Sequence, residues 1–468
     1  MTTMPPADLL LRHGRMITMD ERRRILTDGA VAVRDGRIVA IGPDREVGEA
    51  DAPTAARTRD LRGAVVHPGF VDAHNHTNSR AARGLIPKDS TDWSPVEIAT
   101  LEGMTPELEY ASAMLSCMEM VASGTTIYAD TGGSMFLDET VRAIETVGMR
   151  GLPGWFVVDA PDAFPSLRVS TEEGLRRLED QLDRHPFRAP PGYRPPRARS
   201  AVLLSGMLTD TEGLVIAAKR LADERGVPLI MHKSWDAPEV DVSLRQFGRR
   251  PVERLADIGV LGPNVTLAHA IHLDDSEIAL VAEHETALVH CPAASMLRGV
   301  GAVRVGRFPE ALAAGVTVAL GSDGGRSAKH DVARSMGLVA LANREIRGAF
   351  PVITSEQALE MATLHGARAL GLADEIGALE VGRRADLVVH GLDRTEHHPT
   401  FHDPVDSLVY AMQSGSVESV YVDGEAIYEE RRFTRFDAAA ALAEVDRLAA
   451  NFERRVGIGR FSAWPLID

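Results

Sequence analysis

Eight short apolar segments, separated by stretches with helical periodicity, constrain the fold of this 468-residue chain more than any other feature. The segments lie at residues 64–74, 124–130, 154–160, 201–207, 227–232, 265–270, 286–291 and 317–323. Between them lie helical patterns such as 106–124 and 211–226, the second ending at Gly226. Eight strands that alternate with helices predict an α/β protein with a closed parallel barrel, and an open doubly wound sheet is the alternative.

Both ends of the chain show a different pattern, that of short strands joined by turns. Asp35-Gly36 and Asp423-Gly424 are typical hairpin turns between apolar runs. The simplest arrangement joins both ends into one small β-domain beside the barrel. The predicted boundaries are 1–63 and 375–435 for the β-domain, 64–374 for the barrel, and 436–468 for a C-terminal helix and tail.

The charge balance argues against two classes of partner. The chain has 51 Lys and Arg against 67 Asp and Glu, so its formal net charge is −16, which disfavours binding to nucleic acid or to an anionic membrane. No apolar run approaches the ~18 residues that a membrane-spanning helix requires, and the N-terminus does not resemble a signal peptide. Two cysteines cannot form a disulfide framework. We therefore expect a soluble, cytoplasmic protein.

Four histidines and one aspartate fall at the ends of predicted strands. His74 and His76 end the first strand, His232 the fifth, His269 the sixth and Asp323 the eighth. Residues i and i+2 of a strand point to the same side, so His74 and His76 enter one interior. Catalytic groups converge at the carboxyl ends of barrel strands, and imidazoles with a carboxylate suit zinc or another borderline divalent ion. A single histidine is usually structural, but the five residues together predict a metal site.

Several segments also carry a family resemblance, among them PGFVDAHNH, LAHAIHLDD, LVHCPAAS, GSDGG and GALEVGRRADLVV. From about residue 8 to residue 435 the chain resembles the amidohydrolase superfamily, and within it the triazine hydrolase and cytosine deaminase-like branch. The resemblance implies a distorted (β/α)8 TIM barrel with a flanking β-sandwich built from both termini. By analogy it also implies a homo-oligomer, a dimer or larger.

The resemblance further implies one divalent metal ion held by His74, His76, His232 and Asp323, with His269 beside the substrate. Zinc is the first expectation; iron, manganese and cobalt are alternatives. A second metal usually requires a carbamylated lysine at the end of the fourth strand, and AVLLSGM has none. A divalent ion lowers the pKa of bound water from 15.7 towards about 7. His269 would then stabilise the charge that develops on the substrate, and Asp323 would move a proton from water to the leaving nitrogen.

Two departures from the family pattern leave the reaction open. Deaminases of this branch commonly have a glutamate three residues after the fifth-strand histidine, and that glutamate protonates a ring nitrogen. This chain has Trp235 at the position. Asp236 or Glu239 takes over that role in one interpretation, and both face solvent in the other. The seventh-strand motif reads Pro-Ala-Ala-Ser where the family often has PxSN. Amide, urea or carbamate cleavage and aromatic dechlorination therefore stay open beside ring deamination.

Substrate contacts are expected from loops at the carboxyl ends of the strands. Trp93 and Trp235 are candidates to stack on a flat ring, although packing of the loops onto the barrel explains them at least as well. His290 and Arg298 are further candidates for the pocket wall, and a packing role for His290 is an equal alternative.

The sequence thus favours a metal-dependent hydrolase of a small, electron-poor compound, with aminohydrolase action on a nitrogen heterocycle slightly ahead. The first alternative is an amidase, a urea or carbamate hydrolase, or a chlorohydrolase. A non-catalytic, metal-free scaffold is a further alternative. It is remote because scaffolds of this superfamily have lost metal ligands, whereas this chain retains them.

Overall fold

The computed structural model describes residues 6–51, 54–85, 94–190, 193–206, 208–324, 328–399, 402–412, 414–457 and 464. The chain divides into two compact units. The first unit comprises Met1–Asp72, Met120–Ile127 and Asp331–Phe436, and the second comprises Ala73–Glu119, Tyr128–His330 and Asp437–Asp468.

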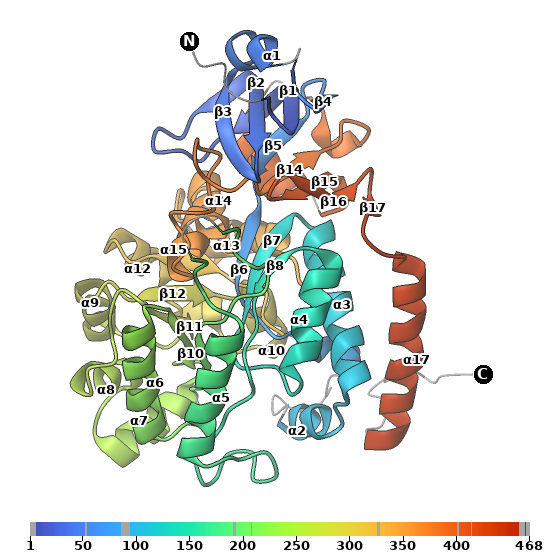
Figure 1. The fold of residues 1–468 in the computed structure, drawn as a ribbon. Helices are drawn as coiled ribbons and strands as arrows, with labels where there is room; N and C mark the ends of the chain where they lie inside the picture. Colours follow the sequence, from blue (N-terminus) through green and yellow to red (C-terminus); the bar gives the residue numbers. More distant parts are fainter. Residues whose placement is uncertain are drawn as a thin grey trace. The chain divides into compact units, whose positions relative to one another are not determined.

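The first unit contains a nine-stranded sheet that combines strands from both ends of the chain (Figure 1). Its strands pair in the order β17-β16-β15-β14-β5-β1-β2-β3, and β4 pairs with β1. They are β1 (Leu9–Ile17), β2 (Ile25–Arg34), β3 (Arg37–Pro43), β4 (Arg57–Asp60), β5 (Val65–Pro68), β14 (Leu387–His390), β15 (Val417–Val422), β16 (Glu425–Glu429) and β17 (Arg432–Phe433).

Both predicted hairpin turns are present in this sheet. Asp35 and Gly36 have φ values of 52° and 74°, and Asp423 and Gly424 have values of 52° and 71°. Consecutive positive φ angles match the twist of the flanking strands, which explains the Asp-Gly pairs. All nine strands belong to one hydrogen-bonded sheet, so the two separate sheets of the expected sandwich are not seen among the described residues.

Helices of the first unit follow the sheet strands or lie between them in sequence. They are α1 (Asp44–Asp51), α13 (Val332–Arg347), α14 (Ser355–Ala362), α15 (Leu364–Ala369) and α16 (Pro404–Asp406), with the short turns η2 (Thr395–His397), η3 (Ser407–Ala411) and η4 (Ser414–Ser416). A single apolar cluster, which includes Leu11, Val33, Val66 and Val389, packs strands from the two ends of the chain together. Burial of these side chains, rather than local propensity, joins the two ends.

Eight further strands follow the alternating pattern predicted for the barrel. A three-stranded sheet has the order β6-β7-β8, with β6 (Phe70–Asn75), β7 (Thr125–Asp130) and β8 (Arg150–Leu152). A parallel five-stranded sheet contains β9 (Val202–Leu204), β10 (Leu229–Lys233), β11 (Val265–His269), β12 (Ala287–His290) and β13 (Val318–Leu320).

Among the residues that the structure describes, the two sheets are not joined into one continuous, closed sheet. Between β8 and the segment before β9 there is an isolated parallel bridge from Gly151 to Ala198. After β13, the backbone N–H of Asp323 donates to the carbonyl oxygen of His74 at 2.9 Å. The third strand also differs from the prediction, because it lies at Arg150–Leu152 and not at 154–160. Pro153 follows it and lacks the N–H that a continuing strand needs.

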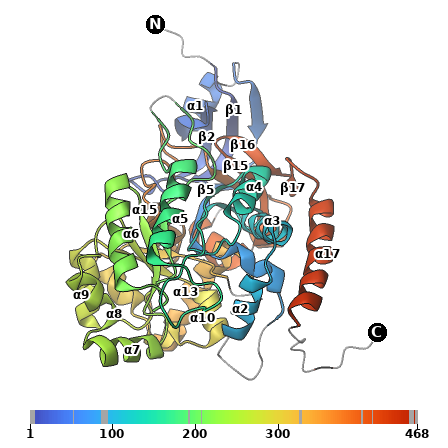
Figure 2. The ribbon, with the colours of Figure 1, turned by 60° about the horizontal axis from the view of Figure 1, so that its bottom comes forward.

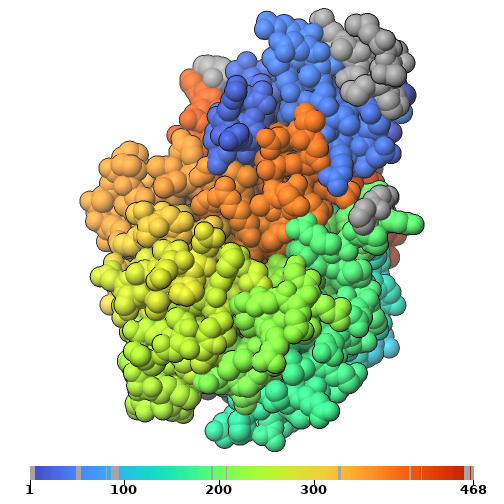
Figure 3. Space-filling model, turned by 60° about the vertical axis from the view of Figure 1, so that its left-hand side comes forward, coloured from blue at the N-terminus to red at the C-terminus, as the bar shows by residue number. Residues whose placement is uncertain are grey.

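The helices of the second unit precede, follow or lie between these strands in sequence, and α6, α8 and α9 lie on one side of the unit (Figure 1 and Figure 2). They are α2 (Ser94–Glu102), α3 (Pro106–Ala122), α4 (Leu137–Val147), α5 (Thr171–Arg184), α6 (Glu212–Arg225), α7 (Ala237–Phe247), α8 (Pro251–Asp257), α9 (Asp275–Glu283), α10 (Pro292–Arg298), α11 (Ala302–Val305), α12 (Phe308–Ala313) and α17 (Ala438–Val456), with the turn η1 (Thr77–Ala82). The outer face of this helical layer appears in green and yellow in Figure 3.

The ends of α6 show how sequence positions these helices. Thr211 caps its first turn by accepting from the N–H of Leu214, and Gly226 ends it with a φ of 62°, as the sequence predicts. Across the described part of the chain, no helix combines the length and apolar character that a bilayer span requires.

Candidate metal centre and active site

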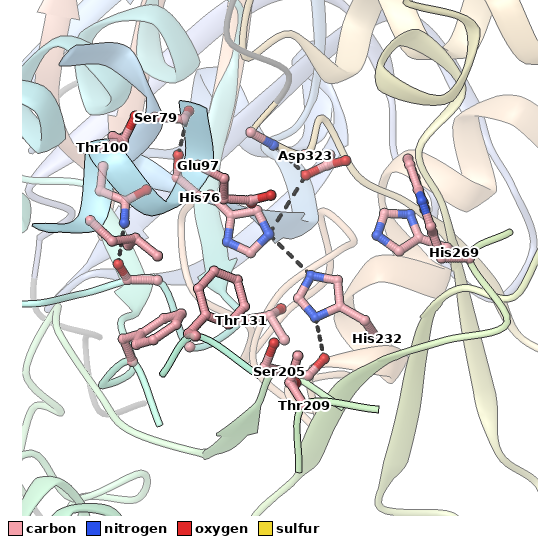
Figure 4. A pocket seen from close by; sticks show the side chains of 18 of the residues that line it. His76, Ser79, Glu97, Thr100, Thr131, Ser205, Thr209, His232, His269 and Asp323 are labelled. Carbon is pink, nitrogen blue, oxygen red and sulfur yellow. Dashed lines mark hydrogen bonds and ion pairs between the residues drawn. The ribbon is translucent and has the colours of Figure 1, made fainter. Parts of the chain in front are cut away.

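Three histidines of the second unit bring their ring nitrogens together. Ligand atoms of His74, His76 and His232 all lie within 4.8 Å of one another. Asp323 faces the same point, with Oδ1 at 3.7 Å from Nε2 of His74 and 3.6 Å from Nε2 of His76. In Figure 4 the rings of His76 and His232 face each other beside Asp323. The structure therefore brings together the four side chains that the sequence predicts as metal ligands.

The surrounding hydrogen bonds leave lone pairs at the centre of this cluster. Nδ1 of His232 lies 2.7 Å from the carbonyl oxygen of Ser205, which can only accept, so Nδ1 carries the proton and Nε2 has a lone pair. Nδ1 of His76 faces the Asp130 carboxylate at 3.7 Å, which places the proton of a neutral His76 ring there as well. The two Nε2 atoms are 3.1 Å apart. Two lone pairs at this distance, next to a carboxylate, require a cation or a proton between them.

Burial and charge shift the pKa values of this cluster in a consistent way. Burial lowers the pKa of His232 to about 4, and His76 contributes in the same direction. Burial, followed by the neighbouring imidazoles, also brings the pKa of His74 well below its usual range. For His76 burial acts downward, but Asp130 and Asp323 outweigh it and raise the pKa. Most of these rings are therefore neutral near pH 7, as metal ligands must be.

Asp323 and His269 occupy strained backbone positions where their strands end. Their φ angles are 55° and 72°, a left-handed region that costs non-glycine residues of order 1–3 kcal/mol. Gly321 precedes Asp323 by two positions, and a Cβ there would lie 2.9 Å from the Cβ of His74. The glycine allows the chain to pass close to His74, which explains part of the GSDGG motif.

His269 lies beside the cluster and is also neutral. Its ring centroid is 4.9 Å from that of His74 and 5.3 Å from that of His232. Burial lowers its pKa well below the usual range, although Asp323 acts in the opposite direction. Its buried Nδ1 has no hydrogen-bond partner. A neutral imidazole with a free nitrogen is suited to contact a substrate atom.

A pocket of about 100 Å³ opens onto the cluster. Two of the predicted substrate contacts line it, namely Trp235 and Arg298. The guanidinium of Arg298 lies 5.2 Å above the Trp235 ring, whose edge meets His269 at a centroid distance of 4.4 Å. Other lining residues include Asn78, Ser79, Glu97, Thr100, Leu101, Thr131, Phe156, Phe164, Ser205, Thr209 and Gly324.

Three other predicted contacts do not line this pocket. Asp236 caps α7 by accepting from the N–H of Glu239 at 2.9 Å. Glu239 is buried and accepts from the backbone N–H of Trp235 at 2.8 Å. His290 is buried with its ring stacked on Phe308 at a centroid distance of 3.9 Å. Local capping and packing thus occupy these side chains. Trp93 lies outside the described residues.

Several residues of the site were not predicted. Thr131 lies with its Oγ1 2.8 Å from Nδ1 of His74, and Asp130 faces His76. Both lie at the end of the strand predicted at 124–130. Their position at a strand end could therefore have identified them from the sequence. The sulfur of Cys291 lies within 4.8 Å of ligand atoms of His74 and His269. No sequence pattern indicated Glu97, which lines the pocket from α2.

With this geometry in view, comparison with known families gives a clear assignment. The model of the amidohydrolase family matches residues 65–427. The chain is 34% identical over 447 residues to a 5-methylthioadenosine/S-adenosylhomocysteine deaminase of Syntrophobacter fumaroxidans, covering 95% of this chain and 98% of the relative. A deaminase of the same description from Halobacterium salinarum is 33% identical, with 92% and 96% covered. The chain belongs to the amidohydrolase family.

Solved structures agree with this assignment. An adenosine deaminase from Xanthomonas campestris with bound zinc superimposes with a TM-score of 0.85 at 28% identity, covering 97% of this chain and all of that one. Atrazine chlorohydrolase from Arthrobacter aurescens complexed with zinc gives a TM-score of 0.83 at 25% identity, covering 94% and 100%. The prediction of a hydrolase acting on carbon–nitrogen bonds other than peptide bonds is confirmed, and both of these solved structures contain zinc.

Proposed function

We propose that this protein is a metal-dependent aminohydrolase that replaces a ring amino group of a nitrogen heterocycle by oxygen and releases ammonia. One observation carries the proposal. The Nε2 atoms of His76 and His232 meet beside the Nε2 of His74 and the Asp323 carboxylate. A pocket that aromatic side chains line opens onto His76, His232 and Asp323. The relatives named as deaminases support the same reaction.

The donor set fits one divalent metal ion held by His74, His76, His232 and Asp323. Second partners fix three of these rings, since Thr131, the Ser205 carbonyl and Asp130 face their Nδ1 atoms. We propose zinc, with iron, manganese and cobalt as alternatives, because neutral imidazoles and one carboxylate suit this ion. When bound, such an ion lowers the pKa of a water molecule and so provides hydroxide near neutral pH.

The side chains around this centre have separate tasks. Burial raises the pKa of the Asp323 carboxyl, but His269, His74 and His76 outweigh it, so the group is ionised and can accept a proton from water. We assign to Asp323 the delivery of that proton to the departing amino nitrogen. His269, neutral and with a free nitrogen, hydrogen-bonds to the reacting part of the ring. Trp235 and Phe156 provide apolar walls for a flat ring.

Adenine nucleosides are the first substrates to test, because the relatives are named for 5-methylthioadenosine, S-adenosylhomocysteine and adenosine. The purified, zinc-loaded protein is expected to release ammonia from at least one of these or from an aminated pyrimidine, purine or triazine. Metal analysis should give one ion per chain, and Asp323→Asn serves as the inactive control. Absence of ammonia from the whole panel would contradict the proposal.

Dechlorination is the second candidate. Trp235 stands where deaminases of this branch have glutamate, and atrazine chlorohydrolase shares the fold at 25% identity. Chloride release from a chlorotriazine without ammonia release from its amino analogue would favour this reaction. Release of an organic amine from amides, ureas or carbamates would instead favour an amidase.

Larger-scale features complete the proposal. The fold similarity to the solved relatives supports a closed barrel over residues 64–374, with 1–63 and 375–435 in the β-domain and 436–468 beyond it. The acidic net charge supports a protein without a nucleic-acid partner. A homo-oligomeric state and a cytoplasmic location stay predictions from the sequence.

A further inference from the structure

A carboxylate outside the predicted set faces the metal-site histidines. Glu97 lies in the first turn of α2 and lines the same pocket as His76, His232 and Asp323. Figure 4 labels it among the side chains that surround this pocket. The residue is partly exposed, and within the described residues its carboxylate forms no hydrogen bond or ion pair. A carboxylate on a pocket wall without a structural partner is available to a ligand.

The usual source of an acid is absent from this pocket. Trp235 occupies the position of the family's glutamate, and its indole has no proton of suitable acidity to transfer. Asp236 caps α7, and Glu239 holds the backbone N–H of Trp235, so neither reaches the pocket lining. Among the described lining residues, the carboxylates are Asp323 and Glu97.

Electrostatic interactions agree with this placement. The charge of Glu97 acts to raise the pKa of both His76 and His232, although burial is the largest influence on each. Arg298 and Trp235 line the same pocket, so a flat ring bound there can meet an acid from α2.

We propose that Glu97, and not a residue of the loop after β10, is the proton donor to the substrate ring. This inference rests on the proposed deaminase function. Water adds its hydroxyl to the ring carbon that bears the amino group, while Asp323 takes the water proton and the Glu97 carboxyl gives its proton to the adjacent ring nitrogen. The carbon–nitrogen bond then breaks as Asp323 protonates the amino nitrogen, and ammonia leaves. The hydroxyl proton of the adduct returns to Glu97 as the ring carbonyl forms.

Substitution of Glu97 by glutamine tests this role. Glu97→Gln keeps the shape of the side chain but cannot transfer a proton, so kcat should fall ~10²–10⁴-fold, whereas KM and bound metal stay within a few-fold of the parent values. Glu102→Gln is the matched control on the same helix, because Glu102 accepts from Ser166 outside the pocket lining. Its activity should equal that of the parent.

Rescue by a second substitution separates proton donation from a structural role of Glu97. Trp235→Glu restores an acid at the family position. Added to Glu97→Gln, it should raise kcat at least ten-fold above that of Glu97→Gln alone. Full activity of Glu97→Gln in a protein that releases ammonia would overturn the role of Glu97 and leave the deaminase function intact. Loss of bound metal together with activity, without rescue, would also overturn it.

Discussion

Two pairs of histidines, one in each unit, hold their Nε2 atoms at nearly the same distance but have different surroundings. His67, His390 and His232 are buried, whereas His76 is partly exposed. In the first unit, Nε2 of His67 lies 2.9 Å from Nε2 of His390. In the second, the corresponding atoms of His76 and His232 are 3.1 Å apart. Burial dominates the lowered pKa of His67, which is about 4, as it does that of His232. A buried imidazole with a lowered pKa therefore does not by itself distinguish a metal site from a structural pair.

The partners of the Nδ1 atoms make the difference. Nδ1 of His67 donates to the carbonyl oxygen of Pro68 at 2.7 Å, which leaves a lone pair on its Nε2. Nδ1 of His390 lies 2.7 Å from the hydroxyl of Ser416, which can donate, so Nε2 of His390 carries a proton for His67. The pair is satisfied with both rings neutral. In the second unit both rings direct lone pairs inward next to Asp323, and only a cation or a proton completes the arrangement.

The largest expected effect is the loss of a metal ligand. His76→Ala and Asp323→Ala should abolish both bound metal and turnover, because each removes a donor from a four-residue set. The loss should exceed the ~100-fold that removal of a supporting partner costs, and should also exceed the effect of His269→Ala. Metal analysis and ammonia release measure it, with His390→Leu as the control that retains metal. Full activity in either ligand variant would refute the site.

Loss of a supporting partner should have a smaller effect. Thr131→Val keeps the shape but removes the hydroxyl next to Nδ1 of His74, so metal affinity should fall ~10–100-fold. Ser416→Ala is the matched change at the other pair and should leave metal affinity unchanged. Titration with a chelator provides the measurement. Equal metal affinity in Thr131→Val and the parent would show that Thr131 does not orient His74.

The structural pair should show its contribution in stability. His390→Ala leaves the buried Nε2 of His67 without its donor, so the free energy of unfolding should fall by ~1–3 kcal/mol at pH 7. Replacement of both rings by leucine removes both polar partners and should cost less. Denaturant unfolding of the single and double variants tests this order. A double variant much less stable than His390→Ala would indicate another role for the pair.

Acid should affect the pair through the lowered pKa values. The pKa of His67 is about 4 in the folded protein, against 6.5 for an unperturbed side chain, so the unfolded state binds the proton first as the pH falls. This contribution to the free energy of unfolding is fully present above pH 6.5 and is lost as the pH falls towards 4. The loss is about 2 kcal/mol at pH 5. The His67→Leu/His390→Leu variant should lose less stability than the parent between pH 7 and pH 5. Parallel curves for the two proteins would contradict the assignment.

Features that depend on neighbouring residues could be predicted from the sequence. The i, i+2 spacing of His74 and His76 places both rings on one side of a strand, whatever the rest of the fold. The Asp-Gly pairs at 35–36 and 423–424 specify tight turns because the backbone there needs positive φ angles. One local signal was missed, since Pro153 moves the third strand to Arg150–Leu152.

Features that depend on distant residues were decided by the tertiary structure alone. Asp236 and Glu239 are polar and close to His232 in sequence, yet the start of α7 uses both of them. Glu97 has no sequence signal, and α2 places it on the pocket wall. Ser205 and Thr131 decide which ring nitrogens hold protons, and they do so from other strands. Periodicity and turn chemistry are local properties of the chain, whereas the direction of a lone pair depends on which strands become neighbours.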